Sequence, residues 1–231
     1  RLKERDFDGI EIVVFHVKDF PVAETRRSLE ENAMECTFCT ALAPDMSAIS
    51  EDAGARQRAR TYLEDCTKVA ADLGAKVFGG AFYAPIGYLP GRRRTGEEWK
   101  REVEFLQSLG DTLTRNDVTL AVEPLNRFET FFLNTVADTV RLCEEVNHPK
   151  VGVLVDTFHA NIEERDVVAA FARAGKHLKH VHTCENDRGT PGTGHVPWTG
   201  VFQVLRDLEY DGWLIIESFG YTIPEIATAA C

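Results

Sequence analysis

Four residues able to bind a metal ion or transfer a proton recur along the second half of the chain. They are three carboxylates and one imidazole, namely Glu123, Asp156, His182 and Glu217. Each ends a short apolar run typical of a buried strand, and successive members are 33, 26 and 35 residues apart. Three carboxylates brought together would repel one another unless a cation lay between them. Because oxygen ligands with one imidazole suit Mn²⁺, Mg²⁺ or Co²⁺, the pattern predicts a divalent metal site.

Each of the four residues, taken singly, also has a structural interpretation. Glu123 could pair with Arg127, and Glu217 could accept hydrogen bonds from the backbone. Asp156 could cap a turn, and His182 could be a satisfied core histidine. Their shared position at the ends of four strands favours a shared chemical role. Three further histidines are interpreted as structural or solvated: His177, His180 and His195. Of these, His180 shares a strand face with His182.

Three more polar residues lie just beyond the same strand ends. Glu129 follows Glu123 by six positions, His159 follows Asp156 by three, and Arg188 lies in a segment rich in turn formers. This segment, residues 185–194, is expected to be a loop and not part of the core. All three side chains would overhang the mouth of the site, and surface salt bridges are the alternative for each.

The elements that must position these residues alternate strictly between strand and helix. Predicted strands cover residues 10–15, 34–42, 76–82, 118–123, 151–156, 178–182 and 213–217, and predicted helices cover 52–73, 97–115, 135–146, 166–174, 198–208 and 223–231. Between the first two strands, a polar stretch after Pro21 carries Leu29 and Ala33 at helical spacing. Such alternation implies a parallel sheet covered by helices. No dinucleotide-binding glycine fingerprint opens an early helix, which argues against a doubly wound sheet. The chain therefore predicts a single (β/α)8 TIM-barrel domain over residues 1–231, with its first strand and part of its last helix lacking.

Composition narrows the range of partners. The chain has 231 residues and a formal net charge of −11, which argues against nucleic acid as a partner. It has no apolar run near the ~20 residues of a membrane span, and no membrane association is expected. Its six cysteines are irregularly spaced, and we interpret them as reduced thiols in a cytoplasmic protein.

Four segments resemble the ketose 3-epimerases, a group that includes the D-tagatose and D-psicose (D-allulose) 3-epimerases within the xylose isomerase-like TIM barrels. The segments are residues 123–130, 155–164, 180–188 and 216–219. The resemblance implies one Mn²⁺ or Co²⁺ ion, with Mg²⁺ possible, held by the four strand-end residues. It implies a small ketose substrate and a homodimer or homotetramer. It also assigns substrate binding to Glu129, His159, Arg188 and Phe219.

The resemblance implies epimerisation of a free ketose at C3, of the tagatose, fructose, psicose or ribulose type. Removing the C3 proton, which is α to the C2 carbonyl, gives a cis-enediolate. Glu123 and Glu217 are the expected acid and base, one on each face of that intermediate. An aldose–ketose isomerase or an inosose dehydratase on the same barrel is the main alternative. A metal-dependent endonuclease of abasic sites and a non-catalytic sugar-binding module are more distant ones.

Overall fold

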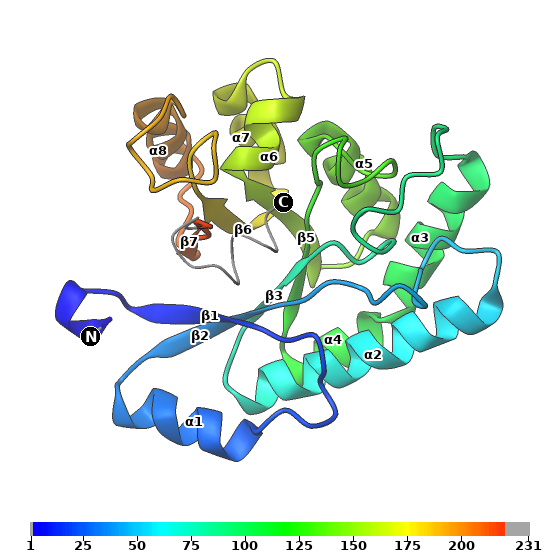
Figure 1. Cartoon of the computed structure of the whole chain (residues 1–231), viewed down its shortest axis with the longest axis horizontal. Coiled ribbons are helices and arrows are strands. Elements are labelled where there is room, and N and C mark those ends of the chain that lie inside the picture. The colour runs from blue at the N-terminus through cyan, green and yellow to red at the C-terminus, as the bar shows by residue number, and fades with distance from the viewer. Residues whose placement is uncertain (1, 220–231) are drawn as a thin grey trace.

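The computed structural model describes residues 2–219, and within them seven strands form one parallel sheet. The strands pair in sequence order, each with the next, as expected of a β/α barrel (Figure 1). Their bounds are β1 Gly9–Val13, β2 Glu35–Cys39, β3 Val77–Gly80, β4 Thr119–Val122, β5 Val151–Asp156, β6 Leu178–Thr183 and β7 Leu214–Ile216. All seven predicted strands are thus present.

Helices surround this sheet on its outer side (Figure 1). They are η1 Lys3–Arg5, α1 Val22–Glu31, α2 Ala53–Asp72, α3 Gly96–Ser108, α4 Gly110–Asn116, α5 Val136–Val146, α6 Thr157–Glu163, α7 Val167–Ala174, η2 Gly175–His177 and α8 Trp198–Asp207. Polar side chains start several of them; Asp52, Thr135 and Asp166 each accept a hydrogen bond from the first turn of the helix that follows. Among the residues described, none of these helices is long and apolar enough to cross a membrane.

The sheet curves into a nearly closed barrel, and within residues 2–219 no backbone ladder joins β1 to β7. Side-chain packing joins these two edges, because a Cβ atom on Gly9 would come within 2.7 Å of the Trp213 ring. Ile10, Val13 and Ile216 remain exposed beside the gap. The predicted TIM-barrel architecture is confirmed. An eighth strand is not among the described residues, and the helix predicted for residues 223–231 lies outside them.

Two helical predictions need correction. Residues 97–115 form two helices and not one; they are separated at Leu109, whose backbone N–H bonds to the Leu106 carbonyl three residues back. The short helix α6 was not predicted, although Asp156 supplies its N-terminal cap. This cap places α6 directly after the strand that carries Asp156.

The barrel interior is packed with side chains and leaves little free space. All six residues of β5 are buried, as befits a strand covered on both faces. Gly79 of β3 lies where a Cβ atom would come within 2.8 Å of Leu154 and 3.3 Å of the His180 ring. A larger residue at position 79 would therefore displace Leu154 and press on the His180 ring.

Candidate metal and substrate site

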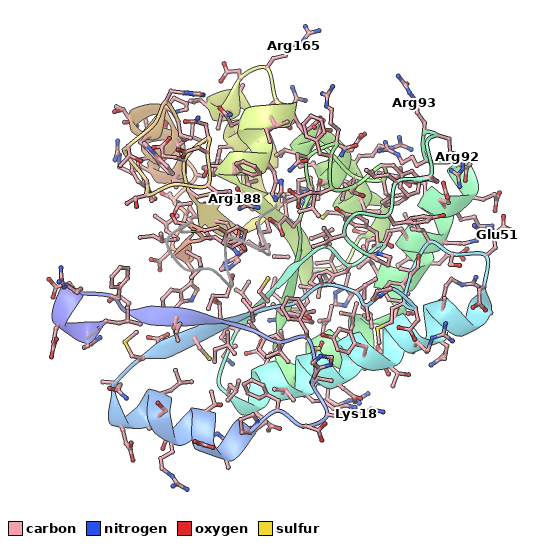
Figure 2. The ribbon with its side chains drawn as sticks, in the orientation of Figure 1. Lys18, Glu51, Arg92, Arg93, Arg165 and Arg188 are labelled. Carbon is pink, nitrogen blue, oxygen red and sulfur yellow. The ribbon has the colours of Figure 1, made fainter. Side chains whose placement is uncertain are left out.

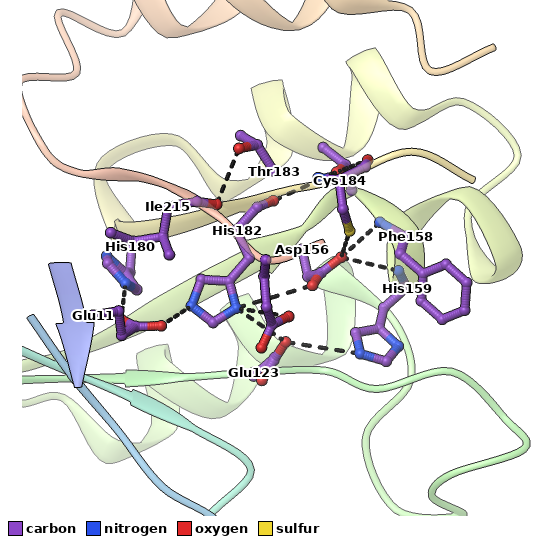
Figure 3. A network of polar contacts seen from close by, with 12 residues as sticks. Glu11, Glu123, Asp156, Phe158, His159, His180, His182, Thr183, Cys184 and Ile215 are labelled. Carbon is purple, nitrogen blue, oxygen red and sulfur yellow. Dashed lines mark hydrogen bonds and ion pairs between the residues drawn. The ribbon is translucent and has the colours of Figure 1, made fainter. Parts of the chain in front are cut away.

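The four predicted metal ligands come together at the carboxyl ends of four strands. Glu123 follows β4, Asp156 ends β5, His182 lies one residue from the end of β6, and Glu217 follows β7. One ligand atom from each lies within 4.8 Å of the others, and Figure 3 shows three of them together, Glu123, Asp156 and His182. The four strand ends thus converge on one point, as expected from the sequence. The assignment of the four side chains to a metal remains a proposal.

The imidazole of His182 is the centre of this cluster. Its Nδ1 lies 3.3 Å from Glu217 Oε2, 3.8 Å from Glu123 Oε1 and 3.9 Å from Asp156 Oδ2. This nitrogen is buried and has no hydrogen-bond partner within the described part of the chain. A buried, unpartnered nitrogen is uncommon, so its position among three carboxylates points to a cation as the absent partner.

The donor set fits a divalent ion that prefers oxygen and nitrogen ligands. One sulfur contacts a residue of the cluster: Cys184 Sγ donates to Asp156 Oδ1 across 3.6 Å. Burial raises the pKa of this thiol to about 12, so it is not a thiolate. The cluster therefore offers three carboxylates and one imidazole, which favours Mn²⁺, Co²⁺ or Mg²⁺ over a thiolate-bound metal.

Burial and mutual repulsion shift the acidities of these groups apart. Burial is the main cause that raises the pKa of Glu123 and of Glu217. Burial would also raise the pKa of Asp156, but Arg188 first, with His159, Glu217 and His182, together outweigh burial and hold that pKa below its usual range. Burial alone would lower the pKa of His182, yet nearby carboxylates, Glu217 first, raise it. The two glutamates thus have the more basic carboxylates of the three.

Arg188 reaches into the same cluster from the loop after β6. Its Nη1 donates to Asp156 Oδ2 at 2.7 Å and to Glu217 Oε2 at 2.8 Å. The guanidinium lies over the rings of Phe158 and Phe219, 4.3 and 4.9 Å from their centroids. In Figure 2 it points towards the interior of the molecule, whereas Arg165 extends away from the surface. Of the predicted substrate residues, two therefore stack on each other, Arg188 and Phe219.

The loop that carries Arg188 is held by a buried carboxylate, which corrects the sequence interpretation. Residues 185–194 were expected to lie outside the core, but Glu185 is fully buried. Glu185 accepts hydrogen bonds from Trp198 Nε1 at 2.6 Å, Gly192 N at 2.6 Å and Val196 N at 3.1 Å. Arg188 adopts a left-handed backbone with φ of 62°, which aims its side chain inward.

His159 and Glu129 are joined through Asn126, a residue that was not singled out in the sequence. The Asn126 backbone N–H donates to His159 Nδ1 at 3.1 Å, and its side-chain amide donates to Glu129 Oε1 at 2.7 Å. The Arg188 guanidinium, which can only donate, approaches His159 Nε2 at 2.9 Å. Burial lowers the pKa of His159 to about 3, which keeps the ring neutral. A neutral imidazole has one acceptor nitrogen, so His159 can accept from Asn126 N or from Arg188 Nη2 but not from both at once.

A cavity of about 500 Å³ opens beside these groups. Its polar side is formed by the residues predicted to bind metal and substrate, and the rest of its wall is largely apolar. The polar residues are Glu123, Glu129, His159, Arg188 and Glu217; the apolar wall includes Val13, Phe15, Ile86, Leu125 and Phe219. The structure thus brings every predicted substrate residue to one cavity.

The contacts of Glu123 and Asp156 decide between a structural role and a place in the cluster for each of them. Arg127 pairs with Glu163 at 3.0 Å, so it does not neutralise Glu123. Asp156 both caps a helix and faces the cluster, because Oδ1 accepts from Phe158 N at 2.6 Å while Oδ2 points to the other ligands. Capping and a place in the cluster are therefore compatible.

Sequence reasoning missed Glu11, which lies in the middle of β1. Its carboxylate lies 2.7 Å from His182 Nε2 and 2.7 Å from His180 Nε2 (Figure 3). Burial would raise the pKa of Glu11, but the two imidazoles hold it well below its usual range. A charged residue between Ile10 and Ile12, within an apolar strand, was the signal that could have identified it.

Comparison with known proteins places this fold and site in a family. Residues 1–230 match the model of the xylose isomerase-like TIM barrel, and the chain belongs to this family. It is 38% identical over 228 residues to a probable ketose 3-epimerase of Synechocystis sp., covering 99% of this chain and 79% of that protein. It is 35% identical to the D-psicose 3-epimerase of Agrobacterium fabrum, covering 92% of this chain and 75% of that protein.

Solved structures give the same result. The crystal structure of a D-allulose 3-epimerase from Methylomonas sp. superimposes with a TM-score of 0.93 at 30% identity, covering 99% of this chain and 80% of that one. The resemblance to the ketose 3-epimerases that was inferred from the sequence is confirmed. These relatives are carbohydrate epimerases by name, which agrees with the predicted isomerase class.

Proposed function

We propose that this protein is a metal-dependent ketose 3-epimerase that inverts C3 of a small, free ketose. The observation that carries the proposal is the convergence of Glu123, Asp156, His182 and Glu217 within 4.8 Å, beside a cavity lined by all the predicted substrate residues. The names of the relatives supply the reaction class, and the site supplies the groups that the reaction needs.

The four converging side chains would hold one divalent ion, Mn²⁺ or Co²⁺. When bound, such an ion supplies Lewis-acid stabilisation of negative charge that develops on the substrate oxygens. The Nδ1 lone pair of His182 and the Oδ2 of Asp156 are the two ligand atoms with no part in proton transfer. Their strands, β5 and β6, are adjacent in the sheet and fix one side of the site.

Glu123 and Glu217 are the proposed acid and base. They follow β4 and β7, which are separated in the sheet by two strands, so the carboxylates approach the cluster from different sides of the barrel. A planar enediolate between them would have one carboxylate near each face. One glutamate takes the C3 proton, and the other returns a proton to the opposite face. The raised pKa of both, caused chiefly by burial, makes each a stronger base than an exposed glutamate.

The remaining polar residues orient the sugar. The guanidinium of Arg188 is a donor for oxygens near the reacting carbon, and His159 lies beside it in the cavity wall. Glu129, held by Asn126, is an acceptor for a hydroxyl at the same end. Phe219 and the apolar wall would contact the far end of the sugar. Since Arg188 is the only cation lining this cavity among the described residues, the site suits a neutral sugar better than a phosphorylated one.

The test is a ketose panel with chelator-treated protein. Fructose, tagatose and ribulose are each incubated in D₂O with Mn²⁺, Co²⁺ or Mg²⁺ added back. The expected result is metal-dependent formation of the C3 epimer with deuterium at C3. Deuterium transfer at C1 or C2 would indicate an aldose–ketose isomerase, and loss of water a dehydratase. Absence of metal-dependent turnover on any ketose would refute the proposal.

The same preparations address assembly. A homodimer or homotetramer is part of the proposal, and light scattering of the metal-loaded protein measures its mass directly. A monomer at assay concentration would remove that part and leave the proposed chemistry untouched.

A further inference from the structure

Glu11 is a buried carboxylate outside the proposed ligand set, yet it contacts one ligand directly. It points from β1 into the barrel, and its side chain is only 6% exposed. Oε1 lies 2.7 Å from His182 Nε2, and Oε2 lies 2.7 Å from His180 Nε2 and 2.8 Å from Thr37 Oγ1. Thr37 is the register partner of Glu11 on β2, so the next strand supplies the third donor. Oε2 thus has two hydrogen-bond partners, and Oε1 is in ion-pair contact with His182 Nε2.

The two nitrogens of His182 compete for the single proton of the neutral ring. Nδ1 faces three carboxylates at 3.3 to 3.9 Å, and each of them attracts a proton to that nitrogen. A nitrogen that binds a metal must instead present a lone pair. At 2.7 Å from an ionised carboxylate, Nε2 has the shorter and stronger attraction for the single proton of a neutral imidazole. Glu11 therefore counters the three carboxylates and keeps the Nδ1 lone pair directed at them.

His180 holds the Glu11 carboxylate in a fixed orientation. Its ring is fully buried and lies 5.1 Å from the His182 ring at 75°. By donating to Oε2, it fixes the plane of the Glu11 carboxylate and leaves Oε1 for His182. The absence of a side chain at Gly79 makes room for this ring. Both histidines alternate onto the inner face of β6, so one strand supplies both donors.

From these contacts we infer that Glu11 is a positioning residue: it fixes the tautomer and ring orientation of His182 so that Nδ1 can bind a divalent cation. The inference rests on the proposed function only in taking His182 as a metal ligand. Carboxylates that accept from a ligating histidine raise its basicity, and their loss weakens metal binding about 10–100-fold. Glu11 also crosses the barrel interior, so it links β1 to the site although β1 has no ladder with β7 in residues 2–219.

A second cation held by Glu11, His180 and His182 is the competing interpretation, because their ligand atoms also lie within 4.8 Å of one another. It requires His182 to bridge two ions as an imidazolate, with both nitrogens deprotonated. The 2.7 Å contacts already pair each oxygen of Glu11 with an imidazole nitrogen without an ion. Stoichiometry separates the two interpretations.

The experiment measures Co²⁺ and Mn²⁺ binding to the full chain without any sugar. Glu11→Gln keeps the shape of the side chain but offers only one acceptor oxygen to two imidazoles. We expect its dissociation constant for Co²⁺ to rise about 10–100-fold, with an altered Co²⁺ absorption spectrum. Glu102→Gln is the matched control, since Glu102 is a buried glutamate that belongs neither to the ligand cluster nor to the cavity wall, and its metal affinity should equal that of the wild type. One bound ion per chain is expected throughout.

Thermal unfolding of the metal-free proteins separates positioning from a structural role. A purely structural Glu11 would lower the melting temperature of Glu11→Gln and leave the metal affinity of its folded fraction unchanged, which would overturn the inference. Two ions per wild-type chain would also overturn it. If Glu11→Gln does not fold, His180→Gln tests the same network, with an expected loss of about 3–10-fold. Wild-type affinity in that variant would then contradict the inference. Metal binding without turnover of any ketose would refute the proposed function alone.

Discussion

Glu123 and Glu102 are both buried glutamates, and burial raises the pKa of both. Their surroundings differ completely. Glu123 follows β4 and faces an imidazole, two carboxylates and a cavity, whereas neither oxygen of Glu102 has a hydrogen-bond partner in the described structure. Glu102 lies in α3 on the stripe that faces the core, with Trp99 and Phe105 one turn away on either side. A raised pKa alone therefore does not identify a catalytic carboxylate; charged partners and access to a cavity do.

The largest expected difference between these two regions is in turnover. Glu217→Gln removes a carboxylate of the cluster but keeps its volume, so one proton-transfer group is lost. We expect kcat to fall about 10²–10⁴-fold, with Mn²⁺ still bound but more weakly. The measurement is kcat on the preferred ketose at saturating Mn²⁺, together with deuterium incorporation at C3.

Glu102→Gln makes the same chemical change in the apolar region and is the control for this experiment. It should retain the wild-type kcat, because no part of Glu102 faces the cavity. Full activity in Glu217→Gln would exclude Glu217 as acid or base. An equal loss in both variants would show that the effect arises from folding and not from chemistry.

A smaller effect is expected from Arg188→Lys, which keeps the positive charge in the site. An ammonium can still pair with Asp156 and Glu217, but it cannot also reach towards His159 Nε2 or stack between Phe158 and Phe219. We expect kcat/KM to fall about 10–100-fold, mainly through KM. A fall in kcat alone, with KM unchanged, would mean that Arg188 acts on the transition state and does not orient the bound sugar.

Glu185 offers a third environment, a buried carboxylate surrounded by donors. Burial would raise its pKa, but the donors, Trp198 first, lower it to about 2. Its contribution to stability is thus present above the unfolded-state value of 4.5 and is lost as pH falls towards about 2. Glu185→Gln should reduce the free energy of unfolding by about 1–3 kcal/mol near neutral pH, since one acceptor oxygen is lost.

Urea unfolding of the metal-free protein at several pH values measures this difference. It should shrink as pH falls below 4.5, because the unfolded wild-type chain then binds a proton that folded Glu185 does not bind until the pH is near 2. A difference that does not vary with pH would mean that shape and packing, and not charge, hold the loop that carries Arg188.

The strand ends could be predicted from sequence because their signals are local. Apolar runs that stop at a carboxylate or imidazole identify Glu123, Asp156 and Glu217 without knowledge of the fold, and the barrel then requires them to converge. Glu11 could not be found in this way. Its partners, His180 and His182, are about 170 positions away, and no local pattern states which way a charged side chain on β1 points.

Burial of isolated polar residues was equally hidden from sequence reasoning. Glu185 lies among turn formers, and only its contacts with Trp198 and the backbone of residues 192 and 196 bury it. Glu102 lies at a helix position that Leu would suit, where the pattern of apolar neighbours predicts the face but not an acid on it. Both cases depend on packing between segments, which a linear pattern does not contain.

The smallest expected effect comes from Glu102 itself and tests the comparison from its apolar side. Because burial raises its pKa well above 4.5, Glu102 is protonated when folded and ionises when the chain unfolds at higher pH. The unfolded state then binds fewer protons, so Glu102 makes the wild type lose stability as pH rises above 4.5, by up to about 1.4 kcal/mol per pH unit until the folded-state pKa is reached. Glu102→Gln cannot ionise and should lack this loss, so its stability relative to the wild type should increase with pH in urea unfolding. A constant difference across that range would mean that Glu102 is charged in the folded protein and has a partner, which would remove the contrast with Glu123.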